Sequence, residues 1–248
     1  VINKIIKYNR NSKKIKINYS KNIFSEIMNI DKIFVINLER RKDRLLKLEK
    51  KLKKIGLNKN MYSVHKATDG WDPKNKIYYD KYRKLLNYKN MIINSYGAMG
   101  LLLTARSLFK KILEKNKYND NFKCLILEDD VFFDKNFNNL INDYKNIFNS
   151  NDYDIIYLGS NQQIWLNESL EQINKLKYYY VQKKKYCYNY GTFAMILNKK
   201  TIELIYDKLK DISLYRLTFD LLIWDIIKKN KLESIILYPN LVVADLRD

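Results

Sequence analysis

The sequence predicts an α/β fold built on a largely parallel β-sheet. Short apolar runs rich in β-branched residues, typical of buried strands, alternate with longer segments whose apolar residues recur at helical spacing. The 248 residues are enough to bury a sizeable core. No internal repeat or low-complexity linker divides the chain. We therefore expect one domain over residues 32–248, preceded by an N-terminal extension or linker over residues 1–31.

The first half of the chain supplies two predicted strands and two predicted helices. Residues 32–38 (KIFVINL) read as a buried strand, and a helix follows from residue 39 until Gly56 stops it. Residues 61–73 are predicted as a strand that runs into a loop, and residues 96–115 as a helix. The helical spacing of the first helix rests on Leu45, Leu48, Leu52 and Ile55.

The second half continues the alternation. We expect strands at 122–127, 152–160, 192–197 and 233–239, and helices at 199–210 and 216–230. The tyrosine-rich residues 178–190 read as a pair of strands joined by a lysine turn.

Composition narrows the classes of function. The 47 Lys and Arg against 27 Asp and Glu give a net charge of +20, which suggests a solvated lysine-rich surface or a basic pocket for phosphates; a nucleic-acid-binding module is the weaker alternative. Two cysteines make no disulfide framework, and a single histidine excludes a multi-histidine metal site. No apolar run is long enough to span a bilayer and no signal peptide is visible, although a chain that begins at Val1 is expected to be a fragment.

Polar residues gather where the predicted strands end. In open α/β sheets the binding crevice lies beyond the carboxyl ends of the strands. Four clusters fall there: Asn37, Glu39 and Arg40; Ala67, Asp69 and Gly70; Glu128, Asp129 and Asp130; and Gly159, Ser160 and Asn161.

The densest of these clusters is the run of three carboxylates at 128–130. Carboxylates bind magnesium or manganese, and such an ion neutralises a diphosphate leaving group. If the strand continues, Glu128 and Asp130 share one side, so that one touches the metal and the other a sugar hydroxyl, while Asp129 points away. The alternative is a solvated corner, which the apolar runs on both sides disfavour.

Arginines at the start of the first helix fit a nucleotide diphosphate. Arg40, Arg41 and Arg44 stand where a helix N-terminus also favours anions. The alternative is an ordinary charged helix face, to which Glu39 and Asp43 would contribute. Neither a P-loop nor a dinucleotide-binding glycine motif is present.

Several stretches together resemble glycosyltransferase family 25. They occur in the family's order over residues 32–248: FVINLERRKDR, KATDG, GAMG, LILEDDVFFDKNF, DIIYLG, YGTFAMILNKKTIELI and FDLLIWDII. The resemblance implies a single GT-A-type domain, a UDP-sugar donor, inversion at the anomeric carbon and a divalent metal, manganese or alternatively magnesium. The transferred sugar would be galactose, glucose or N-acetylglucosamine. The acceptor would be a hydroxyl on a glycan or on a collagen-like protein bearing hydroxylysine.

The resemblance also assigns residues. It makes Asp130 the main metal ligand, with Glu128 and Asp245 as further ligands, and it places Glu128 and Asp129 on the sugar and ribose side. Asp220 is the expected catalytic base, although TFD could instead make it a helix N-cap; Asp225 is the second choice. The remaining substrate-binding assignments are Asn37, Arg40, Arg44, Ala67, Asp69 and Gly70 for the nucleotide, and Gly191 and Thr192 for the sugar and acceptor cleft.

The chain departs from the family pattern in one helix. The family usually carries Glu at the position of Ala98 and Ser-His at the positions of Thr104 and Ala105. These departures keep open a second reading, in which the fold is catalytically degenerate and serves as a binding protein.

Overall fold

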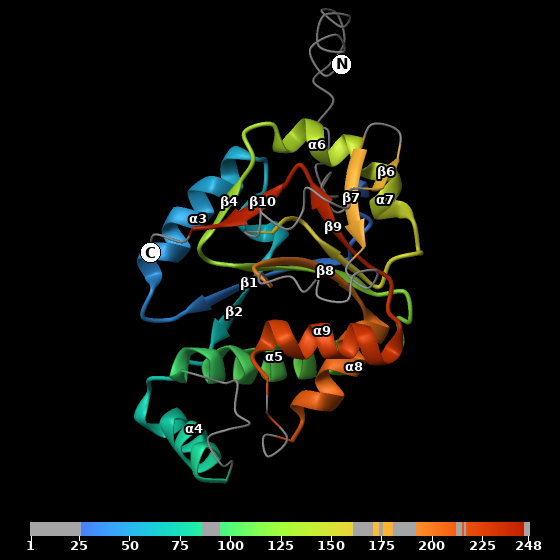
Figure 1. Cartoon of the computed structure of the whole chain (residues 1–248). Helices are drawn as coiled ribbons and strands as arrows, with labels where there is room; N and C mark the ends of the chain where they lie inside the picture. The colour runs from blue at the N-terminus through green and yellow to red at the C-terminus, as the bar shows by residue number, and fades with distance from the viewer. Residues whose placement is uncertain are drawn as a thin grey trace, which may run out of the picture.

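The computed structural model describes residues 26–85, 95–160, 171–173, 176–180, 192–211, 215 and 217–245. A central eight-stranded sheet has the strand order β2-β1-β3-β8-β5-β9-β7-β6 (Figure 1). Among these strands only β8 and β7 run against the common direction. The predicted α/β fold with a mostly parallel central sheet flanked by helices is therefore confirmed.

The strands of the central sheet are β1 (Lys32–Leu38), β2 (Ser63–Ala67), β3 (Lys123–Glu128), β5 (Ile155–Tyr157), β6 (Glu171–Ile173), β7 (Leu176–Tyr180), β8 (Ala194–Asn198) and β9 (Ser234–Tyr238). A second, two-stranded sheet pairs β4 (Val131–Phe133) with β10 (Val242–Ala244). The described helices are α3 (Lys42–Lys54), the short 3₁₀ helix η1 (Lys59–Met61), α4 (Pro73–Leu85), α5 (Tyr96–Lys115), α6 (Phe137–Asp143), α7 (Lys145–Asn149), α8 (Lys199–Leu209) and α9 (Phe219–Asn230).

Helices cover both faces of the central sheet because its strands are apolar on both sides. In β3, Cys124 and Ile126 pack with α5, α8 and α9, whereas Leu125 and Leu127 pack with α3, α6 and α7. Figure 1 shows the same two layers, with the sheet between them. A parallel strand that is buried on both faces has a continuous apolar run in its sequence, and this run is why the sequence predicts β3.

Local signals explain where α3 begins and ends. The predicted helix start at residue 39 is wrong, because Glu39 and Arg40 form a turn in which the Arg41 N–H donates to the Leu38 carbonyl at 2.8 Å. The helix begins at Lys42, and Gly56 follows its end with a φ of 93°, which an L-residue with a side chain rarely adopts.

The predicted strand pair at 178–190 is wrong in its partners. β7 pairs with β6, which precedes it in the chain, and with β9 on its other edge. Residues 181–190 lie outside the described part of the chain.

The small sheet brings the end of the described chain back to the carboxylates. β10 runs antiparallel to β4, with Val243 opposite Phe132. The Asp245 N–H donates to the Asp130 carbonyl at 2.6 Å. None of the described helices has the length and apolar character needed to cross a membrane.

Candidate active site

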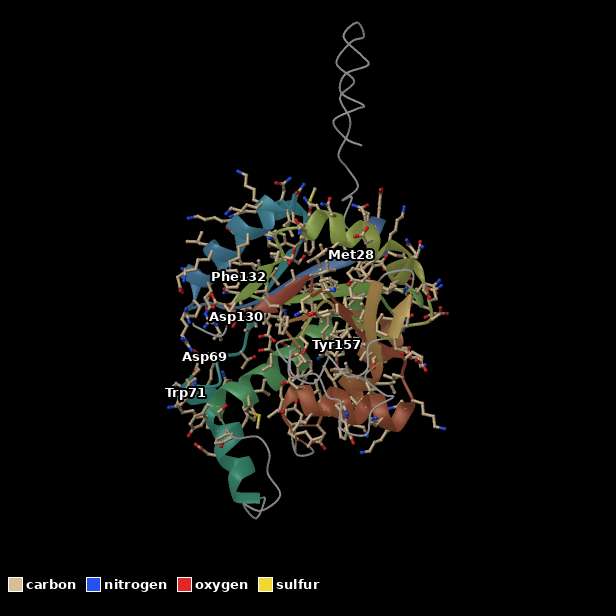
Figure 2. All side chains as sticks on the ribbon, turned by 45° about the horizontal axis from the view of Figure 1, so that its top comes forward. Met28, Asp69, Trp71, Asp130, Phe132 and Tyr157 are labelled. Atoms are coloured by element: carbon tan, nitrogen blue, oxygen red, sulfur yellow. The ribbon has the colours of Figure 1, made fainter. Side chains whose placement is uncertain are left out.

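A cavity of about 270 Å³ lies beyond the carboxyl ends of β1, β2 and β3. The side chains predicted from the strand ends meet here, with Asp130 and Asp69 along one edge of the molecule (Figure 2). The predicted residues that line it are Arg40, Arg44, Ala67, Asp69, Gly70, Glu128, Asp129 and Asp130.

The three carboxylates do not alternate as an extended strand would. β3 ends at Glu128, and the chain turns at Asp129 and Asp130 before β4 begins. The expected alternation, with Asp129 on the other side from Glu128 and Asp130, is therefore wrong, because a turn does not keep the two-residue side-chain alternation of a strand. Asp129 does meet a basic residue, as expected, because Arg44 Nη1 lies 3.5 Å from it. All three carboxylates line the same cavity.

Asp129 is held from two sides. The Asn37 side-chain amide donates to it at 2.6 Å and also donates to the Arg41 carbonyl at 3.0 Å. Arg44 Nη1 lies 3.5 Å from Asp129 Oδ1. Asn37, at the end of β1, thus ties the carboxylate turn to the start of α3.

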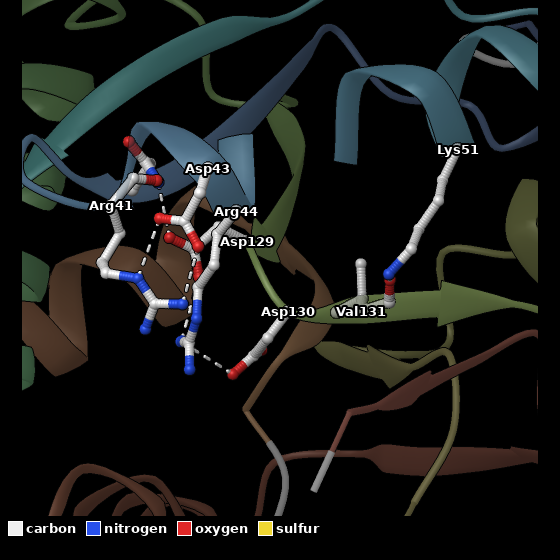
Figure 3. Close-up of polar contacts among 8 residues, drawn as sticks. Arg41, Asp43, Arg44, Lys51, Asp129, Asp130 and Val131 are labelled. Carbon is white, nitrogen blue, oxygen red and sulfur yellow. Dashed lines mark hydrogen bonds and ion pairs between the residues drawn. The ribbon is translucent and has the colours of Figure 1, made fainter. Parts of the chain in front are cut away.

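Asp130 is the least satisfied of the three carboxylates. Its Oδ2 lies 3.3 Å from Arg44 Nη1 (Figure 3), whereas its Oδ1 is buried with no hydrogen-bond partner in the described part of the chain. Burial raises the pKa of Asp130, the neighbouring charge of Asp129 raises it further, and Arg44 opposes the shift. The charge of Asp245 also acts on Asp130, so the predicted third ligand lies nearby.

A hydroxyl links Glu128 to the predicted base. Thr192 Oγ1 donates to Asp220 Oδ1 at 3.0 Å and lies 3.4 Å from Glu128 Oε1. Burial, together with the charges of Asp130, Asp220 and Asp129, raises the pKa of Glu128 to about 8. Burial also raises the pKa of Asp220, and the Thr192 hydrogen bond opposes it.

The structure excludes one of the two readings of Asp220, the helix N-cap. The N-cap of α9 is Thr218, and Asp220 lies inside the first turn of the helix. Asp220 therefore does not cap the helix, and its carboxylate faces Thr192 instead. Asp225, the second choice for the base, pairs with Lys229 at 2.8 Å on the same helix.

The loop after β2 forms the opposite wall of the cavity. Arg40 Nε is paired with Asp69, whose Oδ1 also accepts the Trp71 N–H at 3.0 Å. The Thr104 hydroxyl accepts the Thr68 N–H at 2.8 Å and donates to the Gly100 carbonyl at 2.7 Å. Thr104 thus keeps a hydroxyl at the family's Ser position, whereas Ala105 is buried in the core.

Some residues lie apart from the cavity or were not foreseen. Arg41 is paired with Asp43 at 2.9 Å and does not line the cavity. Gly191 lies outside the described residues. Trp71, Thr68 and Thr104 also line the cavity. Thr68 lies within KATDG and Trp71 follows it, whereas Thr104 was singled out only as a departure from the family pattern.

The described residues contain no group of three or more His, Cys, Asp or Glu side chains arranged to hold a metal ion. What they do contain is a buried, unpaired carboxylate oxygen on Asp130 with further carboxylates around it.

No curated protein matches the chain. One solved structure with similarity to the chain is a glycosyltransferase involved in the glycosylation of the major capsid of PBCV-1. It shares 11% identity at a TM-score of 0.35, and the match covers 72% of this chain but only 64% of that protein.

The family comparison is stronger. The model of glycosyltransferase family 25, described as an LPS biosynthesis protein, matches residues 30–216. This span is most of the chain and contains the β1 end, the loop after β2, the carboxylate turn and Thr192. The protein therefore belongs to glycosyltransferase family 25.

Proposed function

We propose that the protein transfers a hexose from a UDP-sugar to a hydroxyl acceptor, with inversion and with the help of a divalent metal. The observation that carries the proposal is the cavity itself. Three carboxylates and Arg44 meet there at the strand ends, and Thr192 connects Glu128 to the half-buried carboxylate of Asp220. Membership of a glycosyltransferase family supports the same chemistry.

The residues present fit a divalent cation. The buried Asp130 Oδ1 has no donor within the described protein. Burial first, and then the charges of neighbouring carboxylates, raise the pKa values of Asp130 and Glu128, and a bound cation would offset the repulsion among these carboxylates. Asp130 would hold the ion, with Glu128 and Asp245 beside it, and oxygen ligands suit manganese or magnesium. When bound, the ion neutralises the diphosphate as it leaves.

Arginine side chains would bind the phosphate oxygens. Arg44 reaches both Asp129 and Asp130 from the first turns of α3, and its Nε is buried without a partner among the described residues. A guanidinium in that position offers donors to a diphosphate in bidentate geometry. Arg40 stands at the cavity wall, where its pairing with Asp69 fixes it.

Asp220 would take the acceptor proton. The acceptor oxygen bonds to the anomeric carbon while the bond from that carbon to the diphosphate oxygen breaks, and the hydroxyl proton passes to Asp220. Burial raises the pKa of Asp220, which makes it a stronger base. The Thr192 hydrogen bond fixes the carboxylate in one orientation.

A binding role without turnover is the second candidate. Ala98 and the buried Ala105 replace a Glu and a His that the family usually carries on the helix lining the cavity. The acceptor would be a glycan or a hydroxylysine-type protein in either case.

Calorimetric titration with UDP-galactose, UDP-glucose and UDP-N-acetylglucosamine, with and without manganese, tests the proposal. We expect manganese-dependent binding that Asp130→Asn abolishes and that Asp143→Asn, an exposed change on α6, leaves intact. Asp220→Asn should bind the donor but lose release of UDP. Binding without UDP release by the unaltered protein would favour the second candidate, and salt-sensitive DNA binding with no UDP response would overturn both.

A further inference from the structure

Trp71 is an exposed aromatic side chain in the wall of the cavity. Its indole is 54% exposed, although tryptophan is a residue that proteins usually cover. It lines the same cavity as Arg44 and the three carboxylates. In Figure 2 it lies beyond Asp69 on the side away from Asp130.

The indole is held in place before any ligand arrives. The Trp71 backbone N–H donates to Asp69 at 3.0 Å, and the Trp71 ring packs on the Tyr96 ring with the two centroids 4.8 Å apart. Tyr96 is backed in turn by Tyr79, at 4.7 Å, and its hydroxyl donates to Asp80 at 3.1 Å. A fixed ring loses little conformational freedom when a ligand stacks on it.

The strand order says which part of a ligand would meet this ring. From one edge the order is β2, β1, β3, β8. Trp71 follows β2, the carboxylates lie at the end of β3, and Thr192, which holds Asp220, lies two residues before β8. A donor with its diphosphate at the carboxylates and its sugar towards Asp220 therefore runs its other end towards β2.

We propose that Trp71 is the stacking platform for the nucleobase of the donor nucleotide. This inference rests on the proposed function, because it uses the positions given there to the diphosphate and the sugar. Leu38, Ala67 and Leu101 line the same cavity as Trp71, and Lys76 Nζ lies 5.6 Å from the centroid of the indole ring. A flat base has a π-face that stacks on such a surface, whereas the phosphates need the charged end of the cavity.

An acceptor sugar is the other occupant that an aromatic ring suits. The acceptor hydroxyl must reach the base Asp220, which lies on the β8 side of the carboxylates, away from β2. Stacking of the acceptor on Trp71 would place it at the wrong end of the donor. The nucleobase is therefore the occupant that the geometry favours.

Two ligands separate base recognition from phosphate recognition. Calorimetry in manganese measures UDP, which has a base, and inorganic pyrophosphate, which has none. Trp71→Ala should weaken UDP binding about tenfold or more, the range that base–aromatic stacking gives, and leave pyrophosphate binding within twofold. Trp71→Phe keeps an aromatic face and should retain most of the UDP affinity.

Tyr118→Ala is the matched control. Tyr118 is a 91% exposed aromatic residue between α5 and β3, at the opposite end of β3 from the carboxylates, and its loss should change neither affinity. Unchanged UDP binding in Trp71→Ala, an equal loss of UDP and pyrophosphate, or a raised acceptor KM at unchanged UDP affinity would each overturn the inference alone. Absence of UDP binding by the unaltered protein would overturn the proposed function and this inference with it.

Discussion

At the residue scale, Asp130 is a carboxylate whose surroundings cost stability. Its Oδ1 is buried without a hydrogen-bond partner among the described residues, and Asp129 repels it. We expect Asp130→Asn to raise the free energy of unfolding of the metal-free protein by about 1 kcal/mol, because the repulsion disappears while Arg44 keeps Asp129. Urea unfolding in a chelator measures this. A loss of stability would mean that the Arg44–Asp130 pair outweighs the repulsion.

The raised pKa of Glu128 predicts that the stability of the protein depends on pH. Its folded-state pKa of about 8 lies above the ordinary value of 4.5, so the folded protein binds more protons than the unfolded chain between these values. The free energy of unfolding of the metal-free protein should therefore fall, by a few kcal/mol in total, as pH rises from about 4.5 to about 8. Urea unfolding at each pH unit across this range measures the fall.

The control for this pH dependence is a pair of variants. Glu128→Gln removes the titrating group and should flatten the fall, while Glu114→Gln, an exposed change on α5, should preserve it. An equal slope in Glu128→Gln and in the unaltered protein would assign the dependence to other groups.

Some residues of the candidate site could be predicted from the sequence, and others could not. Asp69, Glu128 and Asp130 were identified because strand ends converge at one edge of a parallel sheet. The bridge from Glu128 through Thr192 to Asp220 joins residues 64 and 28 positions apart, and no local pattern reports such a contact. The side each carboxylate faces also depends on the turn at Asp129, which periodicity cannot locate.

At the scale of elements, the contact between α5 and the loop after β2 holds the cavity wall in place. A β-carbon on Gly100 would lie 2.7 Å from the Thr68 carbonyl oxygen and 2.8 Å from the Gly70 nitrogen, both backbone atoms that would have to move. Gly100→Ala should therefore cost about 1–3 kcal/mol of the free energy of unfolding. Thermal or urea unfolding measures this.

Gly97 is the matched control on the same helix. A β-carbon there meets nothing closer than the Ser95 hydroxyl at 3.7 Å. Gly97→Ala should be neutral or stabilise by up to about 1 kcal/mol, because alanine favours helix. Equal effects of the two substitutions would show that close packing does not fix this loop.

The Thr104 hydroxyl adds a hydrogen bond to the same contact between α5 and the loop after β2. Thr104→Val removes the acceptor of the Thr68 N–H and should cost about 1–3 kcal/mol, whereas Thr104→Ser keeps the hydroxyl and should retain the hydrogen bond. The rate of amide hydrogen exchange at Thr68 reports directly whether this hydrogen bond is formed. Protection at Thr68 that survives in Thr104→Val would contradict the assignment.

Elements were predictable in proportion to their length and periodicity. The boundaries of α5 agree with the predicted 96–115, because its apolar stripe runs over five turns. The strands β4 and β10 have three residues each, too few to show alternation. α4 carries lysines and tyrosines on a weakly patterned face, and the apolar spacing predicts no element over residues 74–85. The reversed direction of β8 is a matter of topology that no local pattern encodes.

At the scale of the whole molecule, the net charge of +20 acts on folding and binding in opposite ways. Like charges repel within the compact state, and the repulsion is screened over about 10 Å at 0.1 M salt. The same positive potential attracts a nucleotide diphosphate and speeds its association. Added salt therefore weakens both effects.

The two effects predict shifts of opposite sign in one titration. Raising sodium chloride from 50 to 300 mM should raise the melting temperature of the free protein by about 2–4 °C, the shift that about 1 kcal/mol gives in a chain of this size. The same step should weaken the affinity for UDP but not for uncharged uridine. A melting temperature that falls with salt would mean that exposed ion pairs such as Lys66–Glu39 stabilise the fold more than the surplus lysines destabilise it. Buried pairs such as Arg44–Asp129 are screened less than exposed charges, so we expect the repulsion among the exposed surplus lysines to decide the sign.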